Sequence, residues 1–204
     1  MDIGPGHLLN LEHVWPDSLM NPNCRRFRRH PGLAAATASN VTYRTMKKVN
    51  LRDIPELTWN SPKGTYGGAG KEISEALGRD PYSTDLMKRH PFDVELCRIP
   101  PGKKPGPFHS HSVQWEFYHV ISGRGQVRHA DGTTPIEPGD AFIFGPDEPH
   151  QLINDGAEDL VVYIVADNPL GESGYYPDSK KWLVRSPARQ LIRSENLDYY
   201  DGEE

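Results

Sequence analysis

The sequence predicts an all-β protein, and three observations point to this fold class. Gly and Pro are abundant, with 19 of each among 204 residues, whereas only 36% of the residues are hydrophobic. From Phe92 to Asp167 the chain divides into short segments of strand length, with turn residues between them. Six or more short strands at this spacing favour a sandwich or a closed barrel, because an open sheet would leave unpaired edges.

The length suits one ordinary domain, because domains most often contain about 100–150 residues. Composition and pattern divide the chain into four segments. These are a flexible basic arm at residues 1–45, an N-terminal extension that packs on the barrel at residues 46–90, the barrel at residues 91–168, and a C-terminal extension with an acidic tail at residues 169–204.

The arm has no sustained hydrophobic period and contains the basic cluster Arg25–Arg29. Two other interpretations stay open. Acidic residues are absent between Asp17 and Asp53, as in organelle transit peptides. However, Asp2, Glu12 and Asp17 lie where such peptides avoid acidic residues. Alternatively, translation starts at Met46, where a more globular sequence begins.

The N-terminal extension contains a glycine-rich run, residues 67–70, and a short helical pattern. The run lacks the Lys-Ser/Thr of a phosphate-binding loop and no hydrophobic strand precedes it, so we predict a flexible turn. Ile73 and Leu77 are spaced i,i+4 and Gly78 is placed as a C-cap, which predicts a short helix.

The barrel strands are predicted from alternation and from the turn residues that bound them. After the first segment, which ends at Pro100, the predicted strands are Trp115–Ile121, Gln126–His129, Thr134–Ile136, Ala141–Phe144, His150–Ile153 and Leu160–Ala166.

The C-terminal extension holds an aromatic stretch, Tyr175–Trp182, which forms a lid over the barrel mouth or packs on its outside. Packing is favoured because aromatic side chains bury a large area wherever they can. The tail Glu195–Glu204 is acidic, and we expect it to be solvated.

Charge and hydropathy exclude several classes of function. A formal charge of -5 and a pI near 6.0 argue against binding to nucleic acid or to an anionic membrane. The longest apolar run, Leu160–Ala166, is far shorter than the ~20 residues that span a bilayer. With only two cysteines and no visible secretory signal, we expect a cytoplasmic protein without a disulfide framework.

The chemistry-bearing segment runs from Gly102 to Gly123. His109 and His111 lie two apart, so on one strand their Cβ atoms are roughly 6.5–7 Å apart on one face and both imidazoles can reach one ion. Glu116 lies at an odd offset from His111, which would send it to the opposite face of an unbroken strand. The chain must therefore bend within residues 112–114 if Glu116 is to join the same ion.

His150 opens a later strand after a proline-bounded turn and supplies a third imidazole. We therefore predict that His109, His111, Glu116 and His150 bind one divalent ion, either Mn, Fe, Ni or Zn. Tyr118 shares the strand face of Glu116, which makes it the candidate catalytic residue, although a core position is equally consistent. By contrast, His119 should face away from the ion, and Trp115 and Phe117 are expected to pack.

These two segments resemble the paired motifs of the cupin superfamily. In the first motif a glycine precedes His-x-His, and the spacing from Glu to Gly is met by Glu116 and Gly123, although Gly102 lies one residue farther from the first histidine than usual. In the second motif Gly139, His150 and Asn154 match, whereas Gly145 and Asp147 replace the usual Pro and Gly.

The resemblance covers residues 92–167 and implies a small double-stranded β-helix (jelly-roll) barrel, often dimeric, with the ion in its mouth. We therefore expect a homodimer that acts on a small molecule, without nucleic acid or membrane partners. The leading hypothesis is a metal-dependent enzyme for a small oxygenated metabolite (sugar, sugar phosphate or carboxylate), of isomerase or of dioxygenase or decarboxylase type. The alternative is a non-catalytic cupin that binds a small ligand for sensing or storage. A third hypothesis, a partner-recruiting accessory protein, rests only on the basic arm and the acidic tail.

Overall fold

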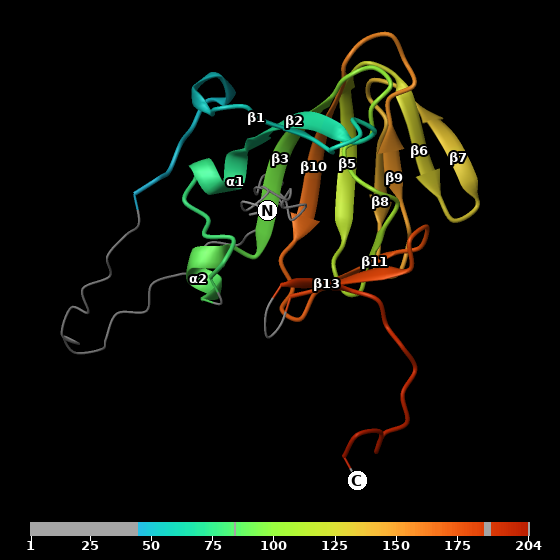
Figure 1. The fold of residues 1–204 in the computed structure, drawn as a ribbon. Helices are drawn as coiled ribbons and strands as arrows, with labels where there is room; N and C mark the ends of the chain where they lie inside the picture. The colour runs from blue at the N-terminus through green and yellow to red at the C-terminus, as the bar shows by residue number, and fades with distance from the viewer. Residues whose placement is uncertain (1–44, 84, 186–188, 204) are drawn as a thin grey trace, which may run out of the picture.

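A computed structural model describes residues 45–203, except residue 84 and residues 186–188 (Figure 1). All but the last residue of the predicted basic arm, together with Cys24, therefore lies outside the described residues. The described chain is mostly β-structure, as predicted. Its elements are η1 (Leu51–Asp53), β1 (Leu57–Asn60), β2 (Gly67–Glu72), α1 (Ile73–Ala76), α2 (Leu86–Arg89), β3 (Phe92–Ile99), β4 (Ser110–His111), β5 (Glu116–Ser122), β6 (Gly125–His129), β7 (Gly132–Ile136), β8 (Ala141–Phe144), β9 (Gln151–Ile153), β10 (Leu160–Asp167), β11 (Ser173–Tyr176), β12 (Lys181–Val184) and β13 (Gln190–Ile192).

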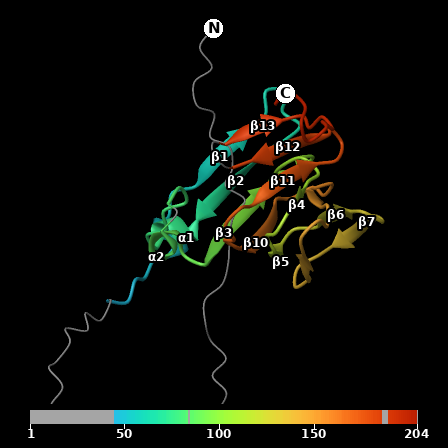
Figure 2. The ribbon, with the colours of Figure 1, turned by 90° about the horizontal axis from the view of Figure 1, so that it is seen from below.

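The strands form three antiparallel sheets. The largest has the order β1-β2-β3-β10-β5-β8, the second has the order β7-β6-β9, and the third has the order β13-β12-β11-β4. The first two sheets form the walls of the barrel in Figure 1. The C-terminal strands lie across one end of it, and Figure 2 shows β11, β12 and β13 from that side.

The barrel core lies between the first two sheets. Apolar side chains from both walls meet there, and Trp59, Phe142 and Phe144 pack against them. The fully or nearly fully buried members are Cys97, Ile99, Tyr118, Val120, Val127, Ile136, Leu152, Leu160, Val162 and Ile164.

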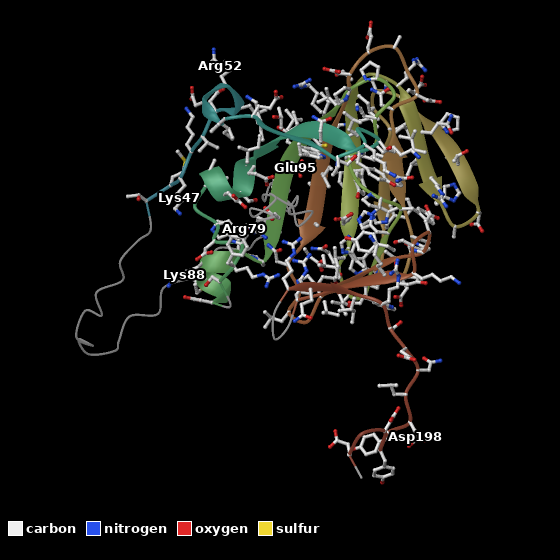
Figure 3. The ribbon with its side chains drawn as sticks, viewed as in Figure 1. Lys47, Arg52, Arg79, Lys88, Glu95 and Asp198 are labelled. Carbon is white, nitrogen blue, oxygen red and sulfur yellow. The ribbon has the colours of Figure 1, made fainter. Side chains whose placement is uncertain are left out.

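Strand β3 turns its more polar face inward. Asp93, Glu95 and Cys97 are fully buried, whereas Phe92 on the other face is exposed. The buried Asp93 carboxylate pairs with Arg79 at 2.8 Å, which compensates the cost of removing both charges from water. Figure 3 shows Arg79 reaching toward β3 from the segment after α1.

The prediction of a flexible turn at residues 67–70 is wrong, because these residues form the buried strand β2 between β1 and β3. The Trp59 ring lies against this backbone, so that a Cβ at Gly68 would lie 2.7 Å from it. Glycine is therefore required by close packing rather than by flexibility.

The short helix predicted after β2 is confirmed as α1. Gly78 follows it with a φ of 92°, and its amide donates a hydrogen bond to the Glu75 carbonyl at 2.7 Å. Within the described part of the chain, no helix is long and apolar enough to cross a membrane.

The aromatic stretch of the C-terminal extension forms the end of β11, the start of β12 and the turn between them. The Tyr175 and Trp182 rings pack at a centroid distance of 4.7 Å, and β11 pairs with β4 through Gly174 and His111. The stretch therefore lies across one end of the barrel, beside the motif histidines, and not only on its outside as favoured. The tail is exposed over residues 195–203, as expected, and Asp198 lies well away from the barrel (Figure 3).

Candidate metal centre

The four predicted ligands lie together inside the barrel. His109, His111, Glu116 and His150 each offer one ligand atom, and these atoms all lie within 4.8 Å of one another. All four side chains are buried, with exposed fractions of 7%, 5%, 0% and 2%. Three imidazoles and one carboxylate in this arrangement could hold a metal ion.

Antiparallel pairing positions the histidines. His109 and His150 form a bridge in which each amide donates to the carbonyl of the other, at 3.1 and 2.8 Å. The centroids of their rings lie 4.7 Å apart. His111 follows on β4, two residues along the same strand segment, so that its ring lies 5.0 Å from that of His109.

The predicted bend between His111 and Glu116 is confirmed. Residues 112–115 lie outside the strands, and Glu116 then begins β5. The bend is tied to the end of β10, because the Gln114 side chain donates to the Asp167 carbonyl at 2.7 Å and the Trp115 amide donates to the Asp167 carboxylate at 2.9 Å. This bend turns the Glu116 carboxylate toward the histidines.

Each histidine uses its Nδ1 atom to donate a hydrogen bond away from the cluster. The acceptors are the Pro107 carbonyl at 2.9 Å for His109, the Glu172 carboxylate at 3.0 Å for His111 and the Glu148 carbonyl at 2.9 Å for His150. Because these acceptors are oxygens without protons, Nδ1 must carry the proton in each ring. The Nε2 atoms are therefore the ones that face the cluster.

The polar atoms at the centre of the cluster fit a metal ion. Among the described residues, Nε2 of His109, Nε2 of His111 and Oε1 of Glu116 are buried without a hydrogen-bond partner. Leaving such atoms unsatisfied costs free energy, and a cation between them would satisfy all three. The donor set of three nitrogens and one carboxylate oxygen suits Mn, Fe, Ni or Zn.

Residues 95–166 match the family model described as the Cupin domain. This part of the chain is a cupin domain. The matched residues include all four side chains of the cluster and end before the C-terminal extension. No curated protein is similar enough in sequence to count as a match.

Solved structures resemble the cupin domain together with part of its extensions. A candidate sugar phosphate isomerase from Acidithiobacillus ferrooxidans is 25% identical, with a TM-score of 0.57 over 66% of this chain and 83% of its own. A sugar phosphate isomerase of the cupin superfamily from Silicibacter pomeroyi is 23% identical, with a TM-score of 0.61 over 74% of this chain and 97% of its own. These likenesses show the double-stranded β-helix fold.

Neighbouring side chains in the cupin cluster shift the pKa values of His109, His111 and Glu116. Burial alone would raise the pKa of Glu116, but His111 and His150 hold it well below its usual value. Burial alone would lower the pKa of His111, but Glu116 and Glu172 raise it to about 10. Burial, followed by repulsion from His150 and His111, lowers the pKa of His109 to about 3.

Tyr118, the predicted catalytic residue, lies behind Glu116. Its hydroxyl donates to Oε2 of that carboxylate, and only 3% of the residue is exposed. Burial and the charge of Glu116 raise the pKa of Tyr118 well above its usual value, so the hydroxyl keeps its proton at neutral pH. Oε2 also lies 2.8 Å from Nε2 of His150. Oε1 is therefore the Glu116 oxygen that is available to an ion.

The neighbouring side chains lie largely as predicted. His119 and Phe117 face the outside of the large sheet, where both line a pocket. Trp115 packs over Gly145, whose Cβ would lie 3.0 Å from the indole, although half of the tryptophan stays exposed. The His150 ring stacks on Phe144 at a centroid distance of 4.4 Å, a contact for which the sequence offered no signal.

Sequence reasoning missed Glu172, whose carboxylate contacts His111 and the bend. It lies 61 residues from its histidine partner, in the loop between β10 and β11. Strand periodicity relates only residues close in sequence, and no motif in the loop marks the carboxylate. No local signal in the sequence could have identified it.

Proposed function

We propose that this cupin is a metal-dependent enzyme that isomerises a sugar or a sugar phosphate. The observation that carries the proposal is the convergence of His109, His111, Glu116 and His150, three of which turn a buried atom without a hydrogen-bond partner toward the others. The similarity to the candidate isomerase of Acidithiobacillus ferrooxidans supports this reaction class over oxygenase or decarboxylase chemistry.

The residues of the chain define what the centre can do. Nε2 of each histidine and Oε1 of Glu116 would hold the ion, while Tyr118 fixes the other carboxylate oxygen. A divalent ion held by three neutral imidazoles and one carboxylate keeps a net positive charge and supplies a Lewis acid for the oxygens of a substrate. The buried surroundings strengthen every charge interaction at the site. A direct catalytic part for Tyr118 stays a prediction.

A second candidate function is a non-catalytic cupin that binds a small ligand for sensing or storage. The cavity beside His109, Tyr118 and His150 measures only about 10 Å³, which is room for a water molecule or an ion but not for a sugar. An isomerase must therefore open a path to the ion before its substrate can bind. A closed metal site that never admits a substrate would favour the second candidate.

Elemental analysis of protein purified without added metal tests the metal centre first. We expect about one ion per chain in the wild type and none in the double variant His109→Ala/His111→Ala, because two of four ligands are gone. His129→Ala is the control, since this partly exposed histidine contacts Thr134 and lies outside the cluster.

Assays with a panel of aldose and ketose phosphates then test the reaction. We expect turnover that is lost in the double variant and kept in His129→Ala. Metal-loaded protein without turnover on sugars or sugar phosphates would favour the second candidate. Wild-type protein without any bound metal would exclude the centre itself.

A further inference from the structure

The C-terminal extension reaches the candidate metal centre from outside the cupin-matched residues. Strand β11 pairs with β4, placing Gly174 opposite His111, and the Tyr176 ring stacks on that of His109 at a centroid distance of 6.1 Å. Glu172 lies just before this strand and is 3% exposed. Two of the four proposed ligands, His109 and His111, therefore contact the β11–β12 hairpin, which follows the barrel in sequence.

The Glu172 carboxylate collects five hydrogen-bond donors from one short segment. Oε1 accepts from Nδ1 of His111 at 3.0 Å and from the Ser112 amide at 3.3 Å. Oε2 accepts from the amides of Val113 at 3.0 Å and Gln114 at 3.1 Å, and from the Ser112 hydroxyl at 3.4 Å. The same side chain therefore holds a ligand ring and the backbone of the bend that leads to Glu116.

We propose that Glu172 is a positioning residue of the metal centre. It keeps the Nδ1 proton of His111 on the far side of the ring, which leaves Nε2 for the ion. By satisfying the amides of residues 112–114, it also holds the bend that brings Glu116 to the cluster. This inference rests on the proposed metal binding.

A carboxylate suits this position better than an amide. Both oxygens of Glu172 face donors, whereas glutamine offers one oxygen and one NH₂ group. In Glu172→Gln the NH₂ group would therefore face either His111 or the amides of the bend. In the first case His111 turns or changes tautomer, and in the second the bend loosens.

A competing explanation is that Glu172 only anchors the hairpin. The hairpin has a second anchor at its turn, where Asp178 accepts two hydrogen bonds from Arg128 at 2.7 and 2.8 Å. Asp178→Asn weakens this anchor without touching the cluster, so it is the matched control for Glu172→Gln.

The test is titration of the metal-free full-length protein with Co²⁺, whose visible absorption reports the ligand set. We expect Glu172→Gln to bind Co²⁺ about 10–100-fold more weakly with a changed spectrum. We expect Glu172→Asp to recover part of the loss, because it restores the carboxylate. Asp178→Asn should keep the wild-type spectrum and an affinity within about twofold, as is expected for a distant site.

Hydrogen exchange of the metal-free proteins gives a second readout. We expect the amides of Ser112, Val113 and Gln114 to exchange faster in Glu172→Gln than in the wild type, with the barrel strands unchanged. If Glu172→Gln does not fold, Glu172→Asp carries both measurements, with a smaller loss expected.

The outcomes separate the inference from the proposed function. Wild-type affinity and spectrum in Glu172→Gln would overturn the role of Glu172 while leaving the metal centre intact. An equal loss in Asp178→Asn would overturn it too, because hairpin anchoring would then explain both results. Wild-type protein that binds no Co²⁺ would remove the metal centre, and the role of Glu172 with it.

Discussion

Glu116 is the residue on which the charges of the centre depend. Its fully buried carboxylate lies 3.4 Å from Nε2 of His111 and 2.8 Å from Nε2 of His150, and it accepts the Tyr118 hydroxyl. In the ion-free protein, a proton on Nε2 of His111 therefore occupies the side of the ring that a metal would use. Metal binding and proton release are consequently linked.

This linkage predicts that metal binding releases about one proton per ion at neutral pH. The pKa of His111 is raised from 6.5 to about 10, so the ion-free protein holds a proton there that the ion must displace. The folded-state pKa is raised, so this proton stabilises the ion-free protein fully below pH 6.5 and ceases to do so as the pH passes about 10. Metal affinity should accordingly rise with pH across this window.

Calorimetric titration in two buffers of different ionisation enthalpy measures the released protons. His109 should contribute none, because its pKa is lowered to about 3. A binding enthalpy that is the same in both buffers would contradict the prediction.

Much of the candidate site could be predicted at the scale of single residues. The spacing of His109 and His111 sets a common strand face, and the odd offset of Glu116 required the bend that the structure shows. Glu172 could not be predicted, because its contacts depend on how β11 docks on β4, and that pairing is a property of the folded chain.

Among the elements, β2 is packed against the indole ring of Trp59. The strand pairs with β1 on one side and β3 on the other. The Trp59 ring lies over Gly68 and Gly70 and donates to the Pro105 carbonyl at 3.0 Å. Gly68→Ala would place a methyl group 2.7 Å from this ring, so the ring or the strand must move.

We therefore expect Gly68→Ala to lower the free energy of unfolding by about 1–3 kcal/mol, the usual cost of overpacking. Urea denaturation measures this change. Gly174→Ala is the control in another strand, because its Cβ would meet its nearest neighbours only at 3.7 and 3.8 Å. Equal stabilities of the two variants would mean that the indole does not require glycine at position 68.

The strands of the barrel were accessible from the sequence, whereas β2 was not. A short apolar run bounded by turn glycines predicted β8 with its observed limits. A run of glycine has no alternation and a low β propensity, so local reasoning favoured a turn. The partner that stabilises the strand, Trp59, acts through packing that no local pattern reveals.

At the scale of the whole molecule, the outer face of the large sheet carries a pocket of about 660 Å³ with mostly apolar walls. Val94 and Phe117 line it, and Ile143 on the neighbouring strand β8 is 54% exposed. Exposed apolar side chains that gather on one face can mark an association site. We propose that the homodimer expected from the cupin resemblance forms through this face.

Size-exclusion chromatography with light-scattering detection measures the oligomeric state. We expect a dimer for the wild type and a monomer for Val94→Asp, because a buried unpaired charge disfavours association. Asp131→Asn, in the exposed turn between β6 and β7, should remain dimeric. A monomeric wild type would contradict the proposal.

The pairing of Gly174 with His111 has a practical consequence for anyone who shortens this protein. A fragment cut at the last cupin-matched residue, 166, would keep every proposed ligand and discard the acid that backs one of them. The match to the family model alone would recommend that cut. A fragment meant to keep the proposed centre should instead extend through β12, because β11 pairs with β4 and Tyr176 stacks on His109.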